Sequence, residues 1–264
     1  MSDFVTPVLL AQALTAVYEA GELIKVARTR PKTITMKGRI DLVTETDLAV
    51  ENLLKQRLAP VLPDAGFMAE ESAESLEPGE LTWIIDPLDG TTNFAHGLPM
   101  VAVSVGLWHA GKVEMGIISI PLLDETFYAV RGEGAFLNGE PMRVTDTILP
   151  VNALVATGFP YSVAEDVESI IAALARVLPA TRGVRRMGAA AVDLAYTACG
   201  RLDAFYEMRL KPWDTAAGWL LVEEAGGAVT RFDGITPYTP GAPDILVSNG
   251  RLHAQLSGLI LGRD

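Results

Sequence analysis

The sequence predicts a mixed fold, with an α+β arrangement in the first part of the chain and an α/β arrangement in the second. Helical spacing of apolar residues marks the N-terminal segment, and strand-like runs joined by tight turns follow it. After a polar connection that ends at Pro150, helical and strand patterns alternate. We therefore expect two domains, at residues 1–150 and 151–264.

The N-terminal segment is expected to form two helices. Apolar residues recur at helical spacing over residues 6–28, and Pro31 ends this first helix. The segment Asp41-Leu-Val-Thr-Glu-Thr-Asp47 follows, and the second helix comes after it and ends before Pro60. The residues of the second helix that we expect to point inward are Leu48, Leu53, Leu54 and Leu58.

Strands are expected from residue 81 onward, because the helical period gives way to short apolar runs bounded by turn residues. The expected strands are 83–85, 101–107, 113–120, 127–130 and 135–137. The first of them is expected to end at Asp86. Ala110-Gly111 and Asn138-Gly139 lie where tight turns are expected, and the Asn-Gly pair is a strong hairpin signal.

The C-terminal part alternates between the two kinds of pattern, which is typical of an α/β unit. The expected helices are 164–177, 189–199, 213–225 and a final short helix. The expected strands lie near Leu154, near Val184, at 204–206, near Val229 and at 245–247. Gly226-Gly227 suits the C-terminal cap of the third of these helices.

The charge balance is strongly acidic and limits the possible partners. The chain of 264 residues carries 33 Asp and Glu against 21 Lys and Arg, a formal net charge of −12. This argues against nucleic acid or an anionic membrane as a partner, and taken alone also against a phosphate-bearing substrate. A single cysteine excludes an internal disulfide and a multi-cysteine zinc site. Because the sequence shows neither a secretory signal pattern nor an apolar stretch long enough to span a membrane, we expect a cytoplasmic protein.

Several carboxylates stand at positions where a polar side chain is unexpected. Asp86 follows an apolar strand, and Asp89 lies three residues on, with Pro87 restraining the backbone between them. Gly90-Thr91 comes next, where a backbone open to close approach can hold an anion. Because hard divalent cations prefer carboxylate ligands, the pattern predicts a magnesium site centred on Asp86 and Asp89.

Four other acidic residues allow two interpretations each. Asp47 and Asp214 stand at helix starts, where Asp is also an ordinary cap, and Glu70-Glu71 could be a solvated pair. Spacing alone does not bring these residues together with Asp86.

Five segments of the chain resemble the inositol monophosphatase family. The segment 83–94, which reads WIIDPLDGTTNF, resembles the first signature of that family, and WDTAAG at 213–218, continuing to EAGG at 224–227, resembles the second. Segments 41–47, 69–72 and 186–195 resemble three more, in the family's order, so that the resemblance runs from about residue 8 to 262. It implies an alternating αβαβα sandwich of the sugar phosphatase type, a homodimer, and magnesium-dependent hydrolysis of a phosphomonoester, often inhibited by lithium.

The resemblance also implies which residues hold metal ions. Glu70, Asp86 and the carbonyl of Leu88 would hold one magnesium ion. Asp86, Asp89 and Asp214 would hold a second, and Glu70 would hold a third, weaker ion through waters. The acidic pocket would then attract phosphate instead of repelling it, since bound cations reverse the local field.

Roles in catalysis and substrate binding follow from the same resemblance. Thr91, paired with Asp47, would orient the attacking water, with Glu70 as the third catalytic residue. The backbone amides of Gly90 and Thr91 would bind phosphate. The expected substrate-binding residues are Asp89, Gly90, Thr91, Gly188, Ala190, Glu207, Lys211 and Asp214.

The sequence departs from the family pattern at a few positions. Ala69 replaces the glycine that usually precedes the two glutamates, and Lys211 stands where some members carry histidine. Arg209 lies between Glu207 and Asp214. Arg185 and Arg186 form a further cationic pair, for which three interpretations stay open: pocket residues, surface charge or part of a dimer interface.

Three functions are compatible with these observations. The first is hydrolysis of inositol monophosphate or a similar polyol phosphate. The second applies the same chemistry to fructose 1,6-bisphosphate, histidinol phosphate or adenosine 3′,5′-bisphosphate, using the nearby cations to bind a second phosphate or a base. The third is a non-catalytic, metal-binding interaction protein, because a fold does not guarantee an activity.

Overall fold

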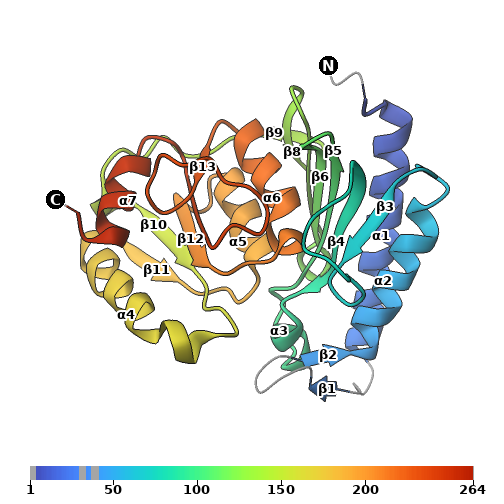
Figure 1. The fold of residues 1–264 in the computed structure, drawn as a ribbon, viewed down its shortest axis with the longest axis horizontal. Helices are drawn as coiled ribbons and strands as arrows, with labels where there is room; N and C mark the ends of the chain where they lie inside the picture. Colours follow the sequence, from blue (N-terminus) through green and yellow to red (C-terminus); the bar gives the residue numbers. More distant parts are fainter. Residues whose placement is uncertain (1–3, 30–33, 37–41, 264) are drawn as a thin grey trace.

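The computed structural model describes residues 4–29, 34–36 and 42–263, which form five stacked layers of helices and sheets. Two helices, a seven-stranded sheet, two central helices, a five-stranded sheet and two further helices follow one another across the molecule (Figure 1). This is the alternating αβαβα sandwich expected from the sequence. No helix in the described part of the chain is long and apolar enough to cross a membrane.

The first sheet is mostly antiparallel and comes from the N-terminal part of the chain. In spatial order its strands are β3 (Gly66–Ala69), β4 (Leu81–Asp89), β5 (Ala102–His109), β6 (Lys112–Ile120), β7 (Glu125–Val130), β8 (Gly134–Leu137) and β9 (Glu140–Met142). Only β3 and β4 pair in parallel. Helices α1 (Pro7–Arg28) and α2 (Glu45–Leu58) cover its outer face, at the right of Figure 1. Strands β1 (Ile34–Met36) and β2 (Leu42–Thr44) form a short antiparallel pair, which lies next to the start of α2, at the bottom of Figure 1.

The second sheet is mixed. Its order is β11 (Gly183–Arg185), β10 (Leu154–Thr157), β12 (Ala204–Met208), β14 (Asp244–Ser248) and β13 (Ala228–Thr230). Strand β10 pairs in parallel with β11 and β12, whereas β14 is antiparallel to β12 and β13. Helices α4 (Val163–Ala180) and α7 (His253–Leu261) cover the far face of this sheet.

The two central helices join the sheets. Helix α5 (Ala190–Ala198) is buried along its whole length, and α6 (Pro212–Glu224) packs between it and the first sheet. Helix α6 approaches strand β6 closely, because a Cβ on Gly116 of β6 would lie 2.6 Å from the carbonyl oxygen of Ala217 in α6. Side chains of both sheets share one apolar core with these helices. The division at residue 150, which separates the strands of the two sheets, stays a prediction.

Some local predictions are wrong. Leu48 was expected to point inward but is 48% exposed. It lies two residues before the buried Val50, and at 100° per residue this places it on the opposite side of α2. The first expected strand does not end at Asp86 but continues to Asp89. Strands β1, β2, β3 and β9 lie in segments where no strand was expected, because they are too short to show a period.

Candidate active site

Strand β4 carries the first two acidic residues of the site. Side chains alternate between the faces of a regular strand, so residues three apart, such as Asp86 and Asp89, would face opposite ways. Here the pairing with β5 shifts register between these two residues, and both carboxylates line the same pocket. The Leu88 amide donates a hydrogen bond to Asp86 Oδ1 at 3.0 Å, which fixes the buried Asp86 carboxylate. The irregular strand end is therefore what brings this pair together.

The turn after β4 places Thr91. Gly90 has φ +87°, in the left-handed region that favours glycine, and helix α3 (Thr91–Ala95) starts immediately after it. The Thr91 hydroxyl lies 2.9 Å from Asp47 Oδ1 and 3.1 Å from the Leu88 carbonyl oxygen, so its proton is directed at these acceptors. Its lone pairs are left to accept a hydrogen bond from the pocket side.

Asp47 is held behind Thr91, in the first turn of α2. Its other oxygen, Oδ2, accepts hydrogen bonds from the amide and the hydroxyl of Thr44, and the bond from the amide is one half of a capping box between Thr44 and Asp47. Burial raises the pKa of Asp47, and the hydrogen bonds from Thr44 and Thr91 oppose that rise. Asp47 is fully buried and does not line the pocket. It is thus both a helix cap and a positioning residue for Thr91.

Two other acidic residues reach the pocket from separate parts of the chain. Glu70 directly follows β3, and its amide donates to the Ile85 carbonyl oxygen at 3.1 Å. Asp214 lies in the first turn of α6, where its carboxylate accepts a hydrogen bond of 2.7 Å from the Lys211 amide. Asp89 also accepts one from the Ala191 amide at 2.6 Å, which ties β4 to the start of α5.

These residues meet in one pocket of about 520 Å³ between the two halves of the molecule. Every expected site residue except Asp47 lines it. These residues are Glu70, Asp86, Leu88, Asp89, Gly90, Thr91, Gly188, Ala190, Glu207, Lys211 and Asp214. The structure thus brings together carboxylates that spacing in the sequence left apart.

The carboxylates repel one another strongly. Burial, followed by the charges of Glu70, Asp89 and Asp214, raises the pKa of Asp86 well above its ordinary value. Burial likewise raises the pKa of Asp89 to about 6. It also raises the pKa of Asp214, with the charges of Asp89 and Glu70 adding to the effect. A site built this way favours a cation that balances the charge.

The donor set fits a hard divalent cation. Carboxylates and a backbone carbonyl are the ligands that magnesium and calcium prefer. Among the residues described, no three His, Cys, Asp or Glu side chains are gathered tightly enough to hold an ion as they stand.

Two further buried acids, Glu207 and Asp193, line the same pocket. Glu207 of β12 is 7% exposed, and burial raises its pKa to about 8, with Arg186 opposing the rise. Asp193 of α5 is 1% exposed, and its Oδ1 has no hydrogen-bond partner among the described residues. The sequence reasoning missed Asp193 as a site residue. An acid within the alanine-rich run at 189–195 was the available signal.

Three of the four cations expected near the site line the pocket, and the fourth, Arg185, does not. Arg186 lines the pocket, with its guanidinium 5.5 Å from the centre of the Phe159 ring. Lys211 and Arg209 line it too, but Arg209 is engaged in a salt bridge of 2.7 Å with Asp166. Arg185 is exposed and is not among the pocket residues.

Ala69, which replaces the usual glycine, is fully buried at the end of β3 and leaves Glu70 in the pocket.

Comparison with known proteins is consistent with this site. The model of the inositol monophosphatase family matches residues 7–261. The chain is 44% identical to inositol monophosphatase 2 of Solanum lycopersicum over 224 residues, which cover 82% of this chain and 84% of that protein. It is 42% identical to inositol-1-monophosphatase of Mesorhizobium japonicum over 202 residues, 76% of each chain.

A solved structure shows the same arrangement of the chain. The extragenic suppressor protein suhB from Bartonella henselae superposes with a TM-score of 0.91 at 36% identity, covering 96% of this chain and 98% of that one. Sequence and fold agree over nearly the whole length. The chain therefore belongs to the inositol monophosphatase family, whose members are metal-dependent phosphoric monoester hydrolases.

Proposed function

We propose that this protein hydrolyses inositol monophosphate or a similar polyol phosphate with the help of two or three magnesium ions. The observation that carries the proposal is the single pocket in which Asp86, Asp89, Glu70 and Asp214 converge beside the Thr91 hydroxyl. In the reaction, water oxygen forms a bond to phosphorus, the bond from phosphorus to the ester oxygen breaks, and the alcohol leaves with a proton.

The metal ligands that we propose are those expected from the family resemblance. Glu70, Asp86 and the Leu88 carbonyl would hold one ion, and Asp86, Asp89 and Asp214 a second. When bound, such ions neutralise the phosphoryl oxygens and favour ionisation of water. The Leu88 carbonyl oxygen accepts from Thr91 and lines the same pocket, so the metal ligands and the water-orienting hydroxyl share one short segment.

We assign the orientation of the attacking water to Thr91. Its proton is directed toward Asp47 and Leu88, so toward the pocket the hydroxyl acts as an acceptor and fixes how a water lies. The Glu70 carboxylate lines the same pocket and would accept a hydrogen bond from that water. Asp47 acts only through Thr91.

Binding of the two halves of the substrate would fall to different walls. The backbone at Gly90 and Thr91 would receive the phosphate, and a Cβ at Gly90 would lie 2.8 Å from the Met100 carbonyl oxygen, so only glycine fits there. Glu207 would accept hydrogen bonds from hydroxyl groups of the alcohol. Gly188, Ala190, Lys211 and Asp214 would complete the alcohol-binding wall.

A second candidate keeps the chemistry and changes the substrate. Arg186 and Lys211 line the pocket and, unlike Arg209, form no salt bridge among the described residues. They could bind the second phosphate of fructose 1,6-bisphosphate or adenosine 3′,5′-bisphosphate. Histidinol phosphate belongs to the same group of alternatives.

A substrate panel separates these candidates. Phosphate release would be measured for each ester with and without magnesium, and the esters ranked by kcat/KM. We expect inositol monophosphate or another polyol monophosphate to rank first, with activity lost in EDTA and restored by magnesium. Preference for a bisphosphate would overturn the polyol assignment. Magnesium binding without turnover of any ester would instead support the non-catalytic interaction protein.

We further propose that the protein works as a homodimer in the cytoplasm and is inhibited by lithium. The family resemblance supports the homodimer and the lithium inhibition, and the sequence composition supports the location. Light scattering coupled to gel filtration tests the dimer, and a monomer mass at micromolar concentration would refute it. Lithium titration of the magnesium-dependent activity tests the inhibition, and activity unchanged at saturating lithium would contradict it.

A further inference from the structure

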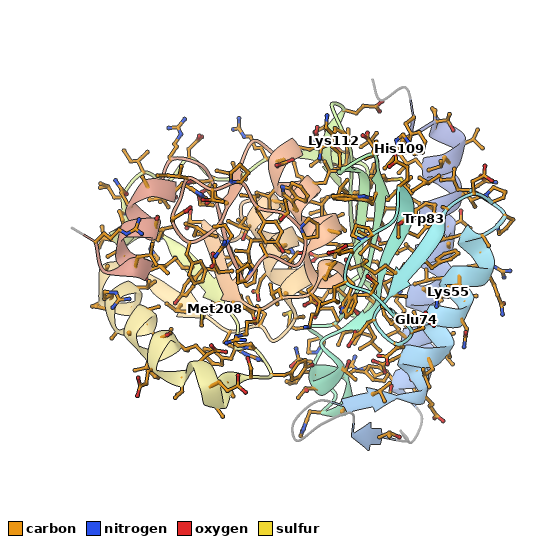
Figure 2. All side chains as sticks on the ribbon, in the orientation of Figure 1. Lys55, Glu74, Trp83, His109, Lys112 and Met208 are labelled. Atoms are coloured by element: carbon orange, nitrogen blue, oxygen red, sulfur yellow. The ribbon has the colours of Figure 1, made fainter. Side chains whose placement is uncertain are left out.

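A second cavity of about 330 Å³ lies on the far side of the second sheet, between α4, α7 and strands β10 and β12. Met208 at the end of β12, labelled in Figure 2, is part of its wall. The lining is mainly apolar, with Ile170, Ala173 and Phe232 among its members. This volume lies at the small end of the range typical of sites for small molecules.

The cavity wall contains a buried hydroxyl group without a partner. Tyr206 is 5% exposed, and its hydroxyl has no hydrogen-bond partner among the residues that the structure describes. Thr157 lies on the same wall, and its hydroxyl donates to the Tyr206 backbone carbonyl oxygen at 2.8 Å. A buried polar group left unpaired is costly, so the Tyr206 hydroxyl indicates a missing acceptor.

A cation stands on the same wall. Arg176 lines the cavity, and its Nε donates to the Leu259 carbonyl oxygen at 2.8 Å, which fixes the guanidinium against the end of α7. Its Nη2 donates to the Ile260 carbonyl oxygen. In the described part of the chain Arg176 forms no salt bridge, so its charge is not neutralised by a carboxylate. An anionic acceptor suits this end of the cavity.

The cavity shares a wall with the active-site pocket. Gly158, Pro160 and Glu207 line both. A Cβ on Gly158 would collide with the Glu207 carboxylate, so the backbone of the loop after β10 packs directly on that side chain. A molecule in the cavity would therefore press on the loop that supports Glu207.

We propose that this cavity binds a small, largely apolar organic acid. The carboxylate of the acid accepts a hydrogen bond from the Tyr206 hydroxyl, beside Arg176. The apolar body of the ligand lies against Ile170, Ala173 and Phe232. Occupancy shifts the Gly158 loop and changes the KM for the phosphate ester. This last effect rests on the proposed function, whereas binding of the acid does not.

Calorimetric titration with 4-ethylbenzoate tests the binding, and the uncharged 4-ethylbenzamide is the control ligand. We expect a dissociation constant in the millimolar range or tighter for the acid and much weaker binding of the amide. Tyr206→Phe removes only the hydroxyl and should weaken binding of the acid about fivefold or more. Tyr196→Phe is the matched control, because the Tyr196 hydroxyl already bonds to Glu125 at 3.2 Å outside the cavity.

Ala173→Leu fills the cavity and should abolish binding of the acid. If that variant does not fold, Tyr206→Phe still decides the matter. Equal binding of the acid by wild type and Tyr206→Phe, or absence of binding by wild type, would overturn the proposal and leave a water as the partner of Tyr206. Because calorimetry needs no turnover, failure of the phosphatase assignment would not change this readout.

Discussion

Replacing Asp47 by Asn tests whether the attacking water is oriented through Thr91. Asp47 accepts three hydrogen bonds, from the Thr44 amide, the Thr44 hydroxyl and the Thr91 hydroxyl. An amide has one acceptor oxygen and one donor nitrogen, so one of these partners must lose its acceptor. If the nitrogen faces Thr91, its N–H donates to the Thr91 oxygen, and the Thr91 proton keeps only the Leu88 carbonyl oxygen as its acceptor. One lone pair of Thr91 is then taken, so the hydrogen bond that Thr91 accepts from the water is weakened and reoriented.

The expected magnitudes differ for activity and for stability. Loss of a positioned proton-handling group typically costs a factor of about 10² to 10⁴ in rate, so we expect kcat to fall by about 10² or more with little change in KM. If the nitrogen instead faces Thr44, the buried Thr44 amide loses its acceptor, which should cost about 1–3 kcal/mol of unfolding free energy. Steady-state phosphate release and denaturant unfolding measure the two effects.

Variants of Thr91 complete the experiment. Thr91→Ser keeps the hydroxyl and should retain activity within about tenfold of wild type, whereas Thr91→Val should lose as much as Asp47→Asn. Because both substitutions remove one device, the double variant should be no slower than the slower single variant. An active Thr91→Val, or losses in kcat that multiply in the double variant, would show that the Asp47 to Thr91 hydrogen bond does not act on the water.

Three more predictions follow from other contacts. His253 forms hydrogen bonds with Thr230 and Ser248, and burial lowers its pKa. The folded state therefore favours the neutral ring, and the protein loses stability as the pH falls below 6.5, the ordinary pKa of histidine. His253→Gln should therefore lose less thermal stability than wild type between about pH 8 and about pH 5.5, and equal losses would contradict this. Gly116→Ala should lower the unfolding free energy by about 1–3 kcal/mol because its Cβ would meet the Ala217 carbonyl oxygen at 2.6 Å, and an unchanged denaturation midpoint would be inconsistent with that packing. Glu207→Gln should raise the KM for a polyol monophosphate more than the KM for ethyl phosphate, which has no further hydroxyl groups. An equal change for both esters would contradict the proposed contact between Glu207 and the polyol hydroxyls.

Much of the fold is predictable from the sequence because its information is local. The 22-residue helix α1 and the hairpin turn at Ala110-Gly111 follow from period and turn residues, and both turn residues indeed have positive φ. Leu48 shows the limit, since which face of α2 is buried depends on what the helix packs against. The short strands β3 and β9 form only because neighbouring strands supply their partners.

The sequence by itself determined that Asp86, Asp89 and Thr91 share one short segment, and its motifs identified the family. Only the tertiary structure brought the remaining groups to that segment. The hydrogen bond from Thr91 to Asp47 spans 44 positions of the chain, and the one from the Ala191 amide to Asp89 spans 102. Contacts at such separations depend on how the layers pack, which no local period records. The irregular end of β4, the buried Asp193 and the cavity at Tyr206 belong to the same class, because each exists only where separate elements meet.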